Sequence, residues 1–334
     1  MPKRVTIPVL IALLLAGIGY FWMSAASPSR QAAALCTAGD EALLRADDEG
    51  ALAAYRKARD KDPDNPRGHF GIARVQIRRR RFVQAARTLK PVVALAGNDA
   101  ETWVALARLL RDARALEQGI PVYSKAIELA PERTELLIEL GNLYSSWGHK
   151  GLHVVEAEKC YRRAEALRPD DPRIHTGLGR LFSLQGTYDS AAVRLKQALR
   201  HKPEDPELLT DFAEVVILRG TPRKAPPYLR QALAADPYHP RARYFLGRTY
   251  LMIGQKAEAD REFAVFKRQK KVWDQIQSLE KSAAERPTAE AYQMLSHLYA
   301  RMGRDSLAAQ RLRRATALNP MVTIPQEVDQ TGAF

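Results

Sequence analysis

The residues best suited to metal chemistry lie close together in the sequence: His149 and His153 are four residues apart, and Cys160 follows them. On a helix this spacing places both imidazoles on one face, as at many zinc sites. Glycines flank the first histidine, however, so a turn is expected there, and exposed loop histidines explain the stretch better than a metal site. Cys36 and Cys160 are the only cysteines, too few for a thiolate zinc site.

Short catalytic signatures are absent from the sequence, which has no His-Glu-x-x-His, no Walker-type phosphate loop, no Gly-x-Ser-x-Gly elbow and no Cys-x-x-Cys. We therefore expect no catalytic residue, no metal and no cofactor, and a protein that is not an enzyme. An enzyme remains the third interpretation, because residues of a dispersed site would escape this search.

The densest charged stretch is the run of four arginines at 78–81. Nucleic-acid sites usually spread basic residues over a surface and add aromatic side chains for stacking, so nucleic acid is an unlikely partner. The run is expected at the end of a helix and in the following turn, as a solvated edge, with anionic lipid headgroups as the alternative ligand. The formal net charge of +14 favours acidic partners and does not bear on the fold.

The helices expected to carry these residues repeat with a period of 34 residues. In 172–205, Leu178 and Phe182 lie four apart on a first helix, Gly186 lies in the turn, and Pro203 follows a second helix that it cannot continue. The second helix carries a small, a large and a small residue in order, so that two helices can approach closely. This trio recurs as Ala51, Tyr55, Ala58; Ala157, Tyr161, Ala164; Ala191, Leu195, Ala198; Ala225, Leu229, Ala232; and Ala308, Leu312, Ala315.

This pattern closely resembles the tetratricopeptide repeat family over most of the chain after residue 31. The resemblance implies an all-α fold, a right-handed α-solenoid of helix-turn-helix repeats with an extended concave surface. About eight repeats are predicted, seven of them within 32–273, followed by a helical extension at 274–288 and a C-terminal tail at 323–334. The repeats are placed at 32–65, 66–99, 100–133, 134–171, 172–205, 206–239, 240–273 and 289–322.

In this family the first helices of successive repeats line a groove for a partner, and the resemblance carries that role over residue by residue. The groove residues so implied are Arg67, Phe70, Arg74, Arg78, Arg108, Arg111, Arg173, Arg180, Arg241, Tyr244, Phe245 and Arg248. Arginine recurs at the ninth position of a repeat, where its planar donors could hold a partner's carboxylates. Acidic residues occupy groove positions of the fourth and sixth repeats, so the expected groove has alternating basic and acidic stripes. These acidic residues are Glu135, Glu139, Glu207, Asp211 and Glu214. Each groove arginine either contacts the partner or pairs with an acidic residue of a neighbouring repeat.

Three departures from the repeat pattern bear on the structure. Arg80 occupies a turn position where glycine is expected, and the fourth repeat carries four extra residues. Residues 256–286 contain no Gly or Pro, so one long helix is expected, with an apolar stripe that includes Val272, Ile276 and Leu279. Either the last repeat covers this stripe or it forms a seam between copies of the chain. Because contacts in such an array run between neighbours, the two cysteines are expected to be unpaired thiols.

The N-terminal segment predicts a single-pass membrane protein. Residues 5–23 are uncharged and apolar, and as a helix they would extend about 30 Å, one hydrocarbon core. Residues 1–4 form a basic flank, 24–31 a linker, and aromatic residues lie at the far end of the apolar run. This pattern predicts a cytoplasmic N-terminus with the repeats on the periplasmic or extracytoplasmic side. Cleavage after 24–26 as a signal peptide is the alternative.

Together these observations predict a non-enzymatic scaffold or adaptor tethered to a membrane. Its groove is expected to hold an extended or helical protein segment, preferentially an acidic one. The alternative is a self-assembling structural protein that forms homo-oligomers through the 256–286 helix.

Overall fold

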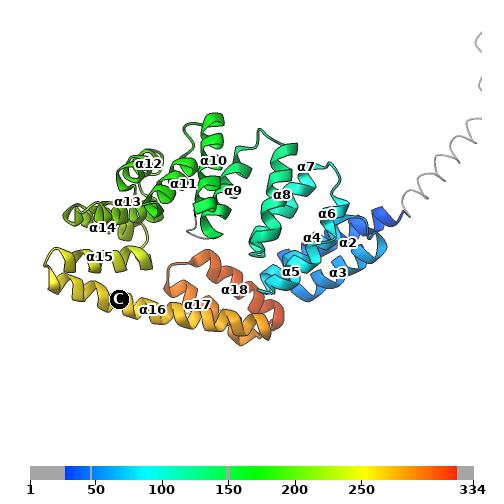
Figure 1. Ribbon diagram of the computed structural model, residues 1–334. Helices are drawn as coiled ribbons and strands as arrows, with labels where there is room; N and C mark the ends of the chain where they lie inside the picture. The colour runs from blue at the N-terminus through cyan, green and yellow to red at the C-terminus, as the bar shows by residue number, and fades with distance from the viewer. Residues whose placement is uncertain (1–26, 46, 148–150, 322–334) are drawn as a thin grey trace, which may run out of the picture. The chain divides into compact units, whose positions relative to one another are not determined.

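The computed structural model describes residues 27–45, 47–147 and 151–321, which form helices joined by short loops (Figure 1). The all-α prediction is confirmed for these residues. Contacts divide the chain after Ala115 into an N-terminal and a C-terminal body, a division that falls inside the predicted third repeat.

The helices of each body follow one another as hairpins, apart from short extra turns. The N-terminal body contains α2 (Pro28–Leu44), α3 (Asp48–Lys61), α4 (Pro66–Arg78), α5 (Phe82–Leu89), α6 (Val92–Leu95) and α7 (Ala100–Asp112). The C-terminal body contains α8 (Leu116–Leu129), α9 (Thr134–Trp147), α10 (Gly151–Leu167), α11 (Pro172–Leu184), α12 (Tyr188–His201), α13 (Pro206–Leu218), the 3-10 turn η1 (Pro222–Lys224), α14 (Pro226–Ala235), α15 (Pro240–Met252), α16 (Lys256–Glu285), α17 (Ala289–Arg301) and α18 (Asp305–Leu318).

The first helices of several repeats begin with a polar residue followed by proline. Asn65, Asp171 and Asp205 each accept a hydrogen bond from a backbone N–H of the helix that they precede. The proline occupies the first turn, where its missing N–H costs nothing and its fixed φ suits the helix. The loop sequence therefore sets where α4, α11 and α13 start.

The turns inside the hairpins share one backbone geometry. The second residue after the first helix adopts a positive φ, and the N–H of the following residue bonds back to the carbonyl five residues earlier, as at Thr187 and Phe182. Glycine provides this left-handed conformation at Gly186, Gly220, Gly254 and Gly303. Arg80 and Arg114 adopt it at φ of 56° and 55°, so the arginine anticipated at one turn has a counterpart in the next.

A tyrosine on a second helix packs between two glycines on consecutive first helices. Tyr161 is 1% exposed, and a Cβ on Gly141 or Gly177 would lie 2.8 or 2.4 Å from its ring. In the N-terminal body Tyr55 makes the same contact with two glycines, Gly39 of α2 and Gly71 of α4. Since only glycine leaves room for the ring, these contacts bring neighbouring first helices close together.

Residues 256–285 form one continuous helix, α16, and α17 and α18 pack against it (Figure 1). Val272 and Ile276 are buried under this last hairpin, and Leu279 is partly buried beside them. These three side chains are therefore not an exposed seam between copies. The last repeat of the same chain covers them, which was the alternative that the sequence left open.

No helix among the described residues combines the length and the apolar character needed to cross a bilayer. The predicted anchor at 5–23 and the predicted tail at 323–334 lie outside the described residues.

The tyrosine–glycine contact gives a stability prediction. Gly177→Ala should lower the free energy of unfolding by about 2 kcal/mol, because the added methyl group overlaps the buried Tyr161 ring. Chemical denaturation of the variant measures the loss, and Leu184→Ala, at a half-exposed position of the same helix, is the control expected near wild type. If both variants unfold like wild type, the contact does not set the helix spacing.

Candidate functional site

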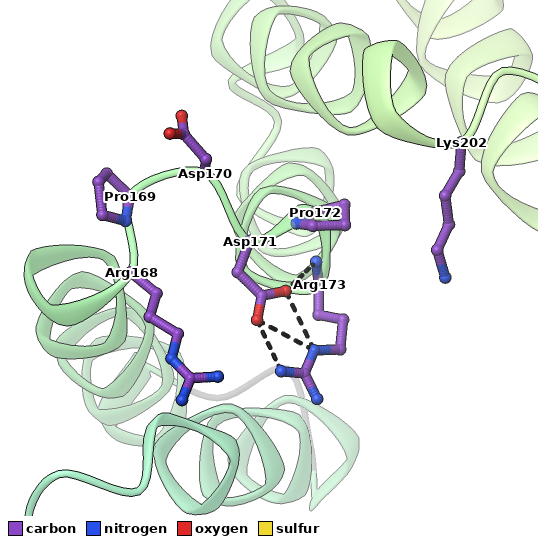
Figure 2. A pocket seen from close by; sticks show the side chains of 7 residues that line it. All are labelled: Arg168, Pro169, Asp170, Asp171, Pro172, Arg173 and Lys202. Carbon is purple, nitrogen blue, oxygen red and sulfur yellow. Dashed lines mark hydrogen bonds and ion pairs between the residues drawn. The ribbon is translucent and has the colours of Figure 1, made fainter.

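Three adjoining hollows open along the first helices of the C-terminal body. The loop hollow, of about 560 Å³, is lined by Arg168, Pro169, Asp170, Asp171, Pro172, Arg173 and Lys202 (Figure 2). The middle hollow, of about 240 Å³, shares Pro172, Arg173 and Lys202 with it. The clamp hollow, of about 470 Å³, shares Asn142, Gly177 and Arg180 with the middle one. The three hollows thus form one groove along α11, flanked by α9 and α13.

A carboxylate held between two arginines forms the wall of the clamp hollow. Asp211 is nearly buried and lies 2.5 Å from Arg180 Nε and 2.8 Å from Arg241 Nη2. Arg241 also reaches Glu207 at 3.0 Å and Glu214 at 2.9 Å. Burial lowers the pKa of Arg241, but Asp211 and Glu214 outweigh that effect and raise it. The five side chains tie α11, α13 and α15 together.

We call these five side chains the clamp. Two of them, Arg180 and Arg241, were expected to bind a partner's carboxylate and are instead paired with carboxylates of the same chain. The three carboxylates of the clamp outnumber its two guanidinium groups, which leaves one negative charge in excess. Glu214, which lines the clamp hollow, is 34% exposed, and Glu207, which lines the adjoining middle hollow, is 55% exposed, so both can be reached from solvent. The part of the groove between these two carboxylates, where the middle and clamp hollows meet, therefore suits a cationic group better than an anionic one.

The loop hollow has the opposite balance of charge. Asp171 accepts hydrogen bonds from the Nε and Nη2 of Arg173, at 3.0 and 2.6 Å, and these bonds lower the pKa of its carboxyl group. Arg168 and Lys202 add two cations, and the Asp170 carboxylate points away from both arginines (Figure 2). Because Asp171 neutralises only one of the three cations, this end of the groove suits a carboxylate.

Between the two charged ends the lining carries polar side chains. Asn142 Oδ1 accepts a hydrogen bond of 2.8 Å from the hydroxyl of Tyr161, which fixes the orientation of the amide. Asn142 is an exposed residue, so its NH₂ group can donate to a ligand. Ser145 and Ser183 also line the clamp hollow, beside the half-exposed Leu184. Such a surface offers donors to a peptide backbone and one apolar contact.

The remaining predicted residues of the C-terminal body lie in the middle of α15. Tyr244 is 41% exposed, and its ring centroid lies 5.8 Å from that of Phe245 and 5.6 Å from that of Phe266. Arg248 is exposed. The structure thus packs the two predicted aromatic residues against each other and against α16, outside the three hollows.

In the N-terminal body the predicted arginines are engaged within the chain. Arg74 Nη1 lies 2.9 Å from Asp40, with Arg67 at 3.9 Å from the same carboxylate, and Arg78 donates to the Leu43 carbonyl at 2.9 Å. Arg111 pairs with Asp112, Arg108 also interacts within the chain, and Phe70 is partly buried. For the paired arginines, the alternative of pairing inside the chain is the one that the structure shows.

The described candidates for metal chemistry are His153 and Cys160, both on α10. His153 stacks on Tyr144, with ring centroids 6.0 Å apart, and His149 lies outside the described residues. The part of the chain that the structure describes holds no cluster of three or more metal-ligating side chains. Both cysteines are free thiols, and burial followed by the charge of Glu156 raises the pKa of Cys160 to about 11.

Three of the groove residues that were not predicted from the sequence are Arg168, Lys202 and Asn142. Arg168 and Lys202 lie just after second helices, whereas the family positions point only to first helices. Asn142 occupies the ninth position of the fourth repeat, where arginine was sought. The repeat spacing could have identified all three, because each lies at a fixed number of residues from the start of a repeat.

Removing the central carboxylate of the clamp should destabilise the C-terminal body. Asp211→Ala is expected to lower the free energy of unfolding by about 2 kcal/mol, because two arginines lose a nearly buried partner. The matched control is Asp189→Ala, which breaks the pair of an 85% exposed carboxylate with Arg219 and should cost less than about 0.5 kcal/mol. Equal losses in urea unfolding would mean that the clamp is an ordinary surface ion pair.

Comparisons with known proteins agree with the fold. Models described as tetratricopeptide repeat match residues 45–109, 100–133, 155–206, 216–282 and 289–320, together more than half of the chain. A crystal structure of a tetratricopeptide repeat protein from Parabacteroides merdae ATCC 43184 is similar, with a TM-score of 0.58 and 15% identity, over 86% of this chain and 99% of that one.

Two further relatives are more distant in length or in shape. Cellulose synthase operon protein C of Xanthomonas axonopodis pv. citri (strain 306) is 30% identical over 157 residues, which cover 44% of this chain and 10% of that relative. The chain therefore spans a small part of that protein's length. YrrB, described as a TPR protein with an unusual peptide-binding site, is 24% identical over 60% of this chain and 93% of that chain, with a TM-score of 0.39.

Proposed function

Because the chain belongs to the tetratricopeptide repeat family, we propose that it is a non-enzymatic scaffold that binds a segment of a partner protein. The binding site is the groove along α11 in the C-terminal body. The observation that supports this proposal is the continuity of three hollows that share lining residues. A continuous groove with polar walls suits an extended chain, whose backbone donors and acceptors need partners along its length.

The charges of the groove define the pattern of the segment. An acidic residue lies in the loop hollow beside Arg168 and Lys202, and a basic residue lies where the middle and clamp hollows meet, between Glu207 and Glu214. Arg173 and Arg180 are seven residues apart on α11, about 10 Å along its axis. An extended chain covers that distance in about three residues. The partner segment is therefore acidic at one end and basic a few residues away, rather than acidic throughout.

The tether completes the proposal. Residues 5–23 anchor the chain in a membrane with the N-terminus in the cytoplasm, and the repeats work on the extracytoplasmic side. The support is the length of the uncharged run and the basic residues before it.

The groove proposal predicts where a partner is captured and which charges hold it. A photoreactive residue at Leu184, in the groove, should capture a partner in cells, whereas one at Val193, exposed on α12, should not. Binding of the captured partner to the double variant Arg168→Glu, Lys202→Glu should weaken about tenfold or more, because two attractive contacts become repulsive. Titration of the purified proteins measures this change.

The control for that titration is Lys196→Glu, which reverses one charge at an exposed position of α12 outside the hollows and is compared with the single variant Lys202→Glu. Equal weakening by the control would indicate long-range charge and not the groove. Capture at Val193 with none at Leu184 would contradict the proposed site.

The tether gives a separate prediction. The full chain should remain with membranes after alkaline carbonate extraction, because a spanning helix is not released by high pH, and deletion of residues 1–26 should release it to the soluble fraction. Release of the full chain by carbonate would contradict the anchor and leave the groove proposal intact.

A further inference from the structure

Two turns of the N-terminal body carry arginine where the equivalent turns of the C-terminal body carry glycine. Arg80 and Arg114 lie 34 residues apart and make the same backbone hydrogen bonds as Gly186, Gly220 and Gly254 at their own turns. A left-handed backbone is strained for any residue with a Cβ, so glycine would be easier to accommodate at both positions. The strain points to a use for the side chains themselves.

The run of four arginines divides into two parts with different surroundings. Arg79 pairs with Glu49 at 2.9 Å, and Arg78 lies 3.2 Å from Asp48, so these two fasten the repeat to its neighbour. Arg80 and Arg81 are exposed and have no ion pair within the described residues.

The neighbouring turns extend this exposed part into a surface. The guanidinium group of Arg114 stacks on the Phe82 ring at 5.3 Å, which joins the turn after α7 to the start of α5. Apolar side chains are exposed on the adjoining helices: Val83, in the first turn of α5, is 68% exposed, and Leu44, the last residue of α2, is 81% exposed. The arginine edge, defined as Leu44, Arg80, Arg81, Val83 and Arg114, thus combines unpaired cations with protruding apolar tips.

We propose that the arginine edge binds the surface of a membrane that contains anionic lipids. Guanidinium groups hold lipid phosphates through their planar donors, and the apolar tips enter the interface between headgroups and acyl chains. The edge consists of two turns and the adjoining ends of α2 and α5, and none of the three hollows includes its residues. Exposed apolar side chains together with cations match a lipid surface better than an acidic peptide, which offers no apolar layer for them to enter. This surface is independent of the partner groove and of the segment 5–23.

The test places an environment-sensitive fluorophore on the edge of the full chain. Cys36 and Cys160 are replaced by Ser, and the dye is attached at Val83→Cys or, as the control position, at Asp64→Cys in the loop between α3 and α4. Each labelled chain is mixed with vesicles of phosphatidylcholine alone or with one third phosphatidylglycerol. We expect the emission at position 83 to brighten and shift to the blue only with phosphatidylglycerol, with no change at position 64.

The charge variants then assign that signal to the arginines. Arg80→Gly and Arg114→Gly should each raise the vesicle concentration needed for half of the signal about fivefold. Both should keep or raise the melting temperature, because glycine relieves the left-handed turn, so a lost signal cannot be attributed to unfolding. Arg56→Gln, at an exposed arginine of α3, should change the half-signal concentration far less.

Three results would overturn the proposal. They are equal signals with both vesicle compositions, an unchanged half-signal concentration in the two glycine variants, and a signal at position 83 from soluble poly-glutamate with none from vesicles. The last result would assign the edge to an acidic protein.

Discussion

The contact between a buried tyrosine ring and two glycines is the constraint on which the groove depends. Tyr161 stands between Gly141 of α9 and Gly177 of α11, where any Cβ would overlap its ring. Because the ring is held from both sides, α9 and α11 lie at a fixed spacing, and Gly177 itself lines the clamp hollow. The same ring donates from its hydroxyl to Asn142, so one side chain sets both the spacing of the helices and the orientation of a groove amide.

Ion pairs between repeats then determine what the groove can bind. Arg180 and Arg241 both pair with Asp211, so their positive charges are largely neutralised within the chain, and the pairs connect α11, α13 and α15. The cations left available are those at the loop hollow, and the carboxylates left available are those on α13. The groove therefore has a cationic end at the loop hollow and an acidic stretch beside α13. In the N-terminal body the same rule applies, since Asp40 binds both Arg74 and the hydroxyl of Tyr55.

The sequence predicted the helices and the turns because these depend on local patterns. Apolar spacing, the proline that closes the second helix and the turn glycine are each recognised within one repeat, and the structure follows them at α11 and α12. The sequence could not predict whether the groove arginines pair within the chain. An arginine at the ninth position can extend into solvent or reach a carboxylate 31 residues away, as Arg180 does with Asp211. Arg114 was not predicted as a turn residue, although it lies one period of 34 residues after Arg80 and adopts the same left-handed backbone. The apolar stripe of α16 could be covered by the same chain or by another, and only the packing of α17 and α18 distinguishes these outcomes.

The central claim is that the groove along α11 binds the partner segment, and hydrogen exchange of the full chain tests it most directly. Exchange is measured by mass spectrometry with and without the captured partner. The account predicts slower exchange in the 168–171 loop, at the start of α11 and on α13, with α12 and α14 unchanged. Protection confined to α12 and α14, with the 168–171 loop exchanging at its free rate, would contradict it.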